Sequence, residues 1–70
     1  METYKERFVK EYKELADRTY KLGCMLTKYD SGTLGFTPTC PIHLLRDQYI
    51  HMDDYLRVLG QRAFYEDIEL

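Results

Sequence analysis

FVKEYKELADRTYKLGCMLTKY, residues 8–29, is the stretch of sequence that decides the fold. Mostly apolar residues recur in it at alternating steps of four and three, which places them on one stripe of an α-helix. This first stripe consists of Phe8, Tyr12, Leu15, Thr19, Leu22, Leu26 and Tyr29. The spacing predicts a long helix that packs along one face.

A second stripe of the same kind runs through residues 42–63, IHLLRDQYIHMDDYLRVLGQRA. Its members are Ile42, Leu45, Tyr49, Met52, Leu56, Leu59 and Ala63. Two stripes of similar length, joined by one short loop, are typical of two antiparallel helices that bury their apolar faces against each other. The sequence therefore predicts an all-α helical hairpin, with residues 1–70 forming a single domain.

Local signals mark the ends of the first helix. Thr3 and Glu6 form a capping-box pattern, which satisfies the first amide groups of a helix. Gly32 permits a positive φ and so suits a turn. These signals predict a helix over residues 3–29 and a loop over residues 30–40.

The second helix follows a proline. Pro41 suits the first helical position, with Thr39 or Cys40 as the capping residue. The pattern predicts a helix over residues 41–66. The tail, residues 67–70, either frays or docks through its two apolar side chains.

A pair of helices this short has a marginal core, because each helix buries only one side. Assembly of several copies is the expected further source of stability. Ile50, Arg57 and Phe64 repeat every seven residues on another face of the second helix. Gly23 permits close approach, either by the hairpin partner or by a neighbouring subunit. We therefore predict a homo-oligomer with contacts at Gly23, Ile50, Arg57 and Phe64.

The net charge of −2 disfavours binding to polymeric nucleic acid. The charge is uneven, since residues 1–29 carry +2 and residues 30–70 carry −4. This asymmetry indicates either attraction between the two helices or between subunits, or a cationic pocket for a small anion.

The N-terminus has no apolar signal segment, and no apolar run reaches the length of a membrane span. We expect a soluble intracellular protein with no membrane partner. In such a compartment Cys24 and Cys40 are expected to be free thiols that pack as small apolar side chains, although a disulfide or redox pair is the alternative.

Catalytic and metal motifs are weak. His43, Asp47, His51 and Asp54 share one face of the second helix, but eight residues rise about 12 Å, so they offer at most a two-ligand half-site. Neither cysteine has a histidine at a recognisable catalytic spacing, and no orienting third group is evident. We predict no enzyme activity, no bound metal and no cofactor.

The chain contains seven tyrosines and no tryptophan. Most of them are expected to be helix contacts whose hydroxyls reach the edge of the core. A tyrosine near a lysine or arginine can also stack on a base while the cation holds a phosphate. Both interpretations are open for Tyr12, Tyr20 and Tyr55.

The sequence resembles small phage proteins that share a helical hairpin. The resemblance rests on Tyr4-Lys-Glu-Arg-Phe8, Glu11-Tyr-Lys-Glu-Leu15, Arg18-Thr-Tyr-Lys-Leu22, Leu45-Arg-Asp-Gln48, Met52, Tyr55-Leu56, Leu59 and Arg62-Ala63. The hairpin is similar to that of the anti-CBASS and anti-Thoeris sponge proteins, which sequester cyclic nucleotide signals of bacterial immunity as hexamers. The resemblance implies inter-subunit pockets in which aromatic rings stack on bases and cations hold phosphates.

The resemblance also implies site residues. Tyr12 matches the family's tyrosine by its following Lys-Glu-Leu. The family's lysine falls at Thr27, and the neighbouring Lys28 is the lysine available here. Arg62, near the far end of the second helix, is the third candidate. We thus predict nucleotide binding by Tyr12, Lys28 and Arg62.

Two functions follow as hypotheses. The first is a non-enzymatic phage sponge for cyclic di- or trinucleotides or a related ADP-ribose-derived signal, acting in the cytoplasm of the infected bacterial host. The second is a small oligomeric adaptor that binds a host or phage protein without any nucleotide.

Overall fold

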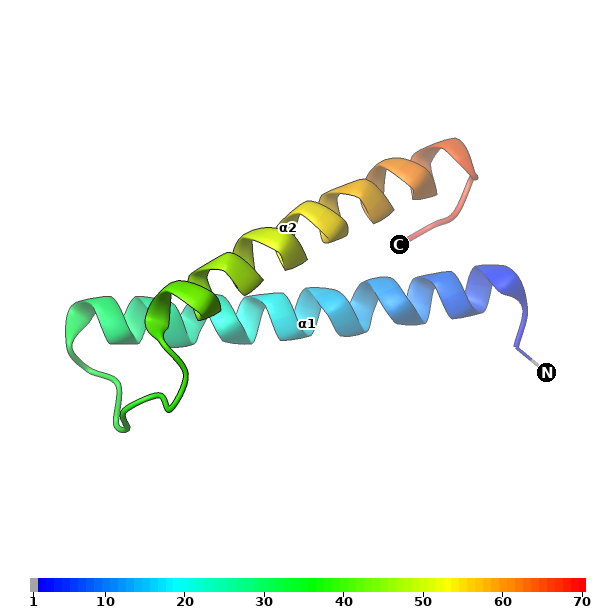
Figure 1. Ribbon diagram of the computed structural model, residues 1–70. Coiled ribbons are helices and arrows are strands. Elements are labelled where there is room, and N and C mark those ends of the chain that lie inside the picture. The colour runs from blue at the N-terminus through cyan, green and yellow to red at the C-terminus, as the bar shows by residue number, and fades with distance from the viewer. Residues whose placement is uncertain (1) are drawn as a thin grey trace.

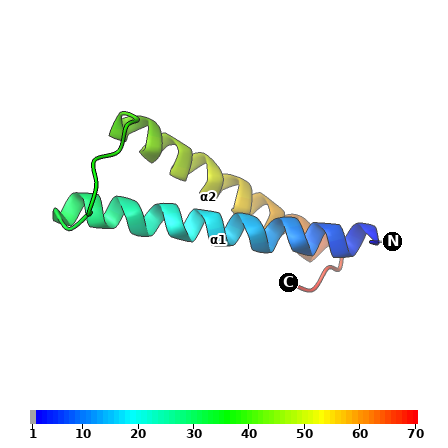
Figure 2. The ribbon, with the colours of Figure 1, turned by 90° about the horizontal axis from the view of Figure 1, so that it is seen from below.

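The structure is a computed structural model that describes residues 2–70. It contains two α-helices, α1 (Tyr4–Ser31) and α2 (Ile42–Tyr65), which run antiparallel, so both chain ends lie at the same end of the molecule (Figure 1). The two helix axes are inclined to each other. The first turns of α2 overlap α1 in Figure 1, whereas the last turns of α2 overlap α1 in Figure 2. The predicted all-α two-helix fold is confirmed.

Capping fixes the two ends of α1. Thr3 is the N-cap, and its Oγ1 accepts a hydrogen bond from the Glu6 amide at 3.1 Å, as the capping pattern predicts. At the other end Gly32 has φ 76°, and the Thr33 amide donates to the Lys28 carbonyl at 2.9 Å. This left-handed glycine stop places the end of α1 at Ser31, two residues beyond the predicted Tyr29.

The start of α2 differs slightly from the prediction. Pro41 is the N-cap itself rather than the first helical residue, and no side chain caps the helix there. Pro41 instead accepts a hydrogen bond through its carbonyl, from the Leu44 amide at 3.0 Å. The prediction of Thr39 or Cys40 as the cap was therefore wrong, because the Leu44 amide in the first turn donates to the Pro41 carbonyl and to no capping side chain.

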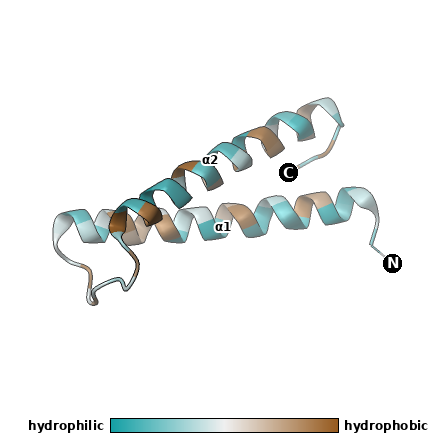
Figure 3. Ribbon diagram, in the orientation of Figure 1, coloured by the Kyte–Doolittle hydropathy of each residue, from teal (hydrophilic) through white to brown (hydrophobic). Residues whose placement is uncertain are grey.

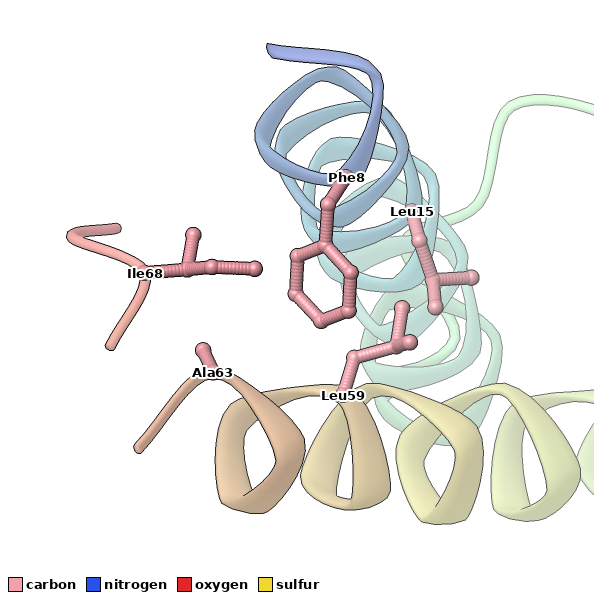
Figure 4. Close-up of a cluster of buried hydrophobic side chains, with 5 residues drawn as sticks. All are labelled: Phe8, Leu15, Leu59, Ala63 and Ile68. Carbon is pink, nitrogen blue, oxygen red and sulfur yellow. The ribbon is translucent and has the colours of Figure 1, made fainter. Parts of the chain in front are cut away.

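The core is concentrated at the end of the hairpin where the chain begins and ends. It is formed by Phe8, Leu15, Leu59, Ala63 and Ile68 (Figure 4). Hydrophobic and hydrophilic residues alternate along both helices, as expected for amphipathic packing (Figure 3). Every member of the two predicted stripes is buried or half-buried except Tyr29, which is exposed because α1 extends past the start of α2 (Figure 1).

The C-terminal tail docks onto this core. Asp67 has φ 59°, a left-handed conformation that turns the chain back after α2. The Ile68 amide then donates to the Ala63 carbonyl at 2.9 Å, and the Ile68 side chain points towards Phe8 (Figure 4). Of the two apolar tail residues, Ile68 is buried and Leu70 is exposed. The docking alternative therefore holds for Ile68.

The hairpin is long and thin. Its extents are 42 × 22 × 17 Å and its radius of gyration is 14.9 Å, whereas a compact chain of this length is expected near 11 Å. Within residues 2–70, neither helix combines the length and apolar character that crossing a membrane requires. The shape leaves large parts of both helices uncovered.

Candidate functional site

The backbone of α1 at Gly23 and the side chain of Tyr49 on α2 approach each other closely. A Cβ built on Gly23 would lie 2.9 Å from Tyr49 Cε2 and 3.6 Å from its hydroxyl oxygen. Side chains do not tolerate the shorter distance, so only glycine lets the ring rest on α1. A glycine inside a helix costs about 1 kcal/mol of stability relative to alanine, and the close packing against Tyr49 offsets this cost.

A cleft of about 410 Å³ opens beside this contact. It is lined by Tyr20, Gly23, Cys24, Thr27, Lys28 and Tyr49. An adjoining cleft of about 330 Å³ shares Gly23, Thr27 and Tyr49 and reaches Asp30 and Arg46. Both volumes lie at the lower end of the range for small-molecule sites. We call the two together the Tyr49 cleft.

An ion pair closes the loop end of the Tyr49 cleft. Arg46 Nη1 donates to Asp30 Oδ2 at 3.1 Å, and Nη2 donates to the other carboxylate oxygen. The hydrogen bonds from Arg46 lower the pKa of Asp30, and those to Asp30 raise the pKa of Arg46. The pair links the last turn of α1 to the beginning of α2.

The part of the cleft lined by α1 also includes a tyrosine and a thiol. Tyr20 is 70% exposed, and a hydrogen bond with the Cys24 side chain raises the pKa of its hydroxyl. Cys24 is a free cysteine, half-buried. Thr27 Oγ1 donates to the Gly23 carbonyl at 3.0 Å, which directs the hydroxyl to its own helix.

The Tyr49 cleft thus presents two phenol rings, one lysine and one arginine. Aromatic rings offer stacking surfaces to a planar base, and cations hold phosphate groups. Among residues 2–70, no three histidine, cysteine or acidic side chains gather as a metal site would require. The arrangement is suited to binding a small aromatic anion.

Only one of the three predicted nucleotide-binding residues lines this cleft, namely Lys28. Tyr12 is half-buried, packs against the hydrophobic core and lies across from Gly60, where a Cβ would be 3.9 Å from Tyr12 Cε2. Tyr12 and Lys28 are 16 residues apart, or about 24 Å along the axis of α1. They cannot meet at one small ligand within one chain.

Arg62 belongs to a polar cluster at the end where the chain begins and ends. Its Nε donates to Glu66 Oε2 at 2.9 Å and its Nη2 donates to the Tyr4 hydroxyl at 2.6 Å. The Tyr4 hydroxyl donates in turn to Glu66 Oε1 at 2.7 Å, and the guanidinium lies 5.0 Å from the Phe8 ring centroid. Arg62 therefore holds the helices together. A joint site of Tyr12, Lys28 and Arg62 would need a second chain and stays a prediction.

The predicted oligomer contacts differ in their surroundings. Gly23 meets Tyr49 of its own chain, which accounts for the glycine without a second subunit. Ile50 and Phe64 are 54% and 79% exposed, and the Arg57 side chain is also exposed. Arg57 and Phe64 line a shallow cleft of about 630 Å³ on the outer face of α2. The contact role of all four stays a prediction.

One further cleft lies beside the docked tail, with a volume of about 520 Å³. Its charged side chains are three lysines and three glutamates, around Val9 and Ile68: Lys5, Lys10, Lys13, Glu6, Glu14 and Glu69. The opposite charges balance and no tyrosine lines it. It is therefore less suited to a nucleotide than the Tyr49 cleft.

Sequence reasoning assigned Tyr49 to helix packing and gave Arg46 no role. Both assignments follow the stripe pattern, which identifies the faces of each helix but not the register between helices. The signal that was present is Gly23, whose lack of a side chain indicates a close approach. Its partner could be named only once Tyr49 was seen opposite it.

Comparison with known proteins gives one match. A family model described as Sequestin matches residues 2–65, which covers both helices. No curated protein and no solved structure matches the chain.

Proposed function

The chain belongs to the Sequestin family, and we propose that it is a non-enzymatic sponge that binds and sequesters a small signalling nucleotide. The family match over residues 2–65 is the observation that carries this proposal, because the family name denotes sequestration. The proposed ligand is a cyclic di- or trinucleotide, or a related ADP-ribose-derived signal, of bacterial immunity. The proposed setting is a phage protein in the cytoplasm of the infected host.

The Tyr49 cleft supports this function by its chemistry. Tyr20 and Tyr49 offer rings to a base, while Lys28 and Arg46 offer charge to phosphates. A sponge needs no chemical step, since removal of the signal requires only binding that outcompetes the host receptor. Its capacity is then set by the number of protein molecules.

Assembly into a homo-oligomer, such as a hexamer, is part of the proposal. The chain exposes 5444 Å² of surface, whereas a compact monomer of 8.4 kDa is expected to expose about 4,600 Å². The surplus of about 800 Å² equals the area that one partner buries in a standard protein interface. Copies packed through the outer face of α2 would cover Ile50 and Phe64.

The test is the melting temperature of the purified protein with a panel of cyclic di- and trinucleotides and cyclic ADP-ribose isomers. A ligand that binds only the native protein raises the melting temperature, by an amount that grows with the logarithm of its concentration. We expect a shift with at least one signal and recovery of that signal intact after denaturation. The absence of any shift at millimolar ligand would contradict the sponge.

One observation favours a second candidate, an oligomeric adaptor that binds a host or phage protein. Phe64 and Tyr65 are 79% and 85% exposed and pack edge to face, with ring centroids 5.4 Å apart. Exposed aromatic clusters of this kind often mark protein contacts. A protein that melts at the same temperature with every nucleotide, yet forms a homo-oligomer that binds a partner protein, would favour the adaptor.

A further inference from the structure

We propose that Arg46 is an anion-binding residue of the Tyr49 cleft. In the absence of ligand, the Asp30 carboxylate accepts the hydrogen bonds of the Arg46 guanidinium that a ligand phosphate would otherwise accept. This inference deepens the proposed function and rests on it for the identity of the anion. It assigns a cation that the sequence pattern leaves without a role. It also assigns a competing carboxylate that sets how readily the site accepts an anion.

The geometry of the pair is the first support. Both terminal nitrogens of Arg46 donate to the two oxygens of Asp30, so the whole planar fork of the guanidinium is engaged. This fork matches a carboxylate and a phosphate equally well. Asp30 therefore occupies the position that two phosphate oxygens would take.

The second support is that the pair is open to exchange. The Arg46 and Asp30 side chains are 43% and 54% exposed, and exposed ion pairs contribute little to stability. Asp30 also lies in the last turn of α1, where the helix dipole disfavours a carboxylate. A phosphate carrying more charge can displace it without unfolding the hairpin.

The third support is location. Arg46 and Tyr49 are three residues apart on α2 and line the same cleft. The adjoining cleft, which Lys28 lines, shares Gly23, Thr27 and Tyr49 with it. A phosphate held by Arg46 leaves the Tyr49 ring for the attached base. The second cation, Lys28, lines the adjoining cleft, where it is available for a second phosphate.

The test uses the full chain and inorganic pyrophosphate, followed by the side-chain Nε–Hε resonance of Arg46 in nitrogen-15 NMR. We expect pyrophosphate to shift this resonance. Asp30→Asn removes the competing carboxylate and is expected to tighten binding about two- to fivefold, the range that exposed ion pairs support. Arg46→Gln lacks this resonance, so its pyrophosphate affinity is measured by titration calorimetry alongside that of the wild type. It is expected to be weaker by about tenfold or more, as the loss of a charge-assisted bidentate contact predicts.

Asp54→Asn is the matched control. It removes one negative charge beside another exposed arginine, Arg57, whose Nη2 lies 4.0 Å from Asp54 Oδ1. If both variants tighten pyrophosphate equally, net charge explains the effect and the inference fails. An Arg46 resonance that does not move in the wild type or in Asp30→Asn would also overturn it.

The outcome is independent of the sponge hypothesis. Pyrophosphate binding through Arg46, without a melting shift for any nucleotide, would keep the anion site and remove the nucleotide function. Nucleotide binding that Arg46→Gln leaves unchanged would keep the function and refute the assignment of Arg46. Folding of each variant is checked by the rest of its NMR spectrum.

Discussion

Gly23 lies so close beneath the ring of Tyr49 that a Cβ at this position would come within 2.9 Å of Tyr49 Cε2. A second glycine faces a second tyrosine at the other end of the hairpin, but with more room. A Cβ on Gly60 would lie 3.9 Å from Tyr12 Cε2, an ordinary van der Waals distance. The two glycines share a helical setting and differ in the space above them, which makes them a natural pair for comparison.

Gly23→Ala is expected to lower the free energy of unfolding by about 1 kcal/mol. Alanine gains about 1 kcal/mol in helix propensity, while forcing the Tyr49 ring off α1 costs about 1–3 kcal/mol of packing strain. The displaced ring also reshapes the Tyr49 cleft, so ligand affinity should fall. Urea unfolding measures the first effect. In the double variant with Tyr49→Ala, the penalty of Gly23→Ala should disappear.

Gly60→Ala is expected to raise the free energy of unfolding by up to about 1 kcal/mol. The position is helical, its φ is not positive, and the added methyl meets the Tyr12 ring without overlap. The gain in helix propensity therefore remains uncompensated. If Gly60→Ala and Gly23→Ala changed the urea midpoint in the same direction and by the same amount, the close contact at Tyr49 would have no energetic meaning.

Much of the fold could be predicted because it depends on local spacing. The stripes from Phe8 to Leu26 and from Ile42 to Ala63 follow from helical periodicity, and Thr3 marks a helix start by its side-chain chemistry. The inclination and register of the helices are not local. Tyr29 satisfies the periodicity and is nevertheless exposed, because the end of α1 extends past the start of α2 and has no helix opposite it.

The candidate site was less predictable than the fold. Contacts such as Gly23 with Tyr49 and Asp30 with Arg46 join residues from different helices, so they depend on the register. The resemblance supplied Lys28, which does line the cleft. It could not show that Arg62 would be engaged by Tyr4 and Glu66.

Ile68→Ala is expected to lower the free energy of unfolding by about 2–4 kcal/mol. Ile68 is buried against Phe8 and Ala63, and large-to-small changes in a core cost the transfer energy plus that of the cavity. Leu70→Ala is the control, since Leu70 is 47% exposed and should cost less than about 0.5 kcal/mol. Equal effects in urea unfolding would mean that the tail does not dock in solution.

The stability of the hairpin is expected to fall in acid because of Glu66. The hydrogen bond from Tyr4, followed by the one from Arg62, holds the pKa of Glu66 below its ordinary value of 4.5. The folded state therefore binds this proton less readily than the unfolded state, and stability rises with pH in this range. The contribution is complete above 4.5 and is lost as the pH falls through the lower folded pKa.

The measurement is the urea midpoint of the wild type and of Glu66→Gln from about pH 6 down to about pH 3. Glu66→Gln should be less stable at neutral pH and should show a shallower decline in acid. Asp30 adds a decline of the same sign, since Arg46 lowers its pKa, and Asp30→Asn should remove that part. A slope that is the same in all three proteins would contradict the role of these pairs.

Phe64→Glu is expected to dissociate the proposed oligomer into chains of 8.4 kDa. Phe64 is 79% exposed and is not a member of the core cluster, so the substitution should leave the helical content unchanged. A charge buried against a neighbouring chain, in contrast, strongly opposes association. Light scattering coupled to gel filtration measures the mass, and circular dichroism the helicity.

The control is Gln48→Glu, which adds the same charge at an exposed position about 160° around α2 from Phe64. It should preserve the mass of the wild type if the contact follows Ile50, Arg57 and Phe64. Dissociation by Gln48→Glu alone would move the interface to the other side of α2. A wild type that is monomeric at high micromolar concentration would remove the interface altogether, and the surplus surface would then need a partner protein to cover it.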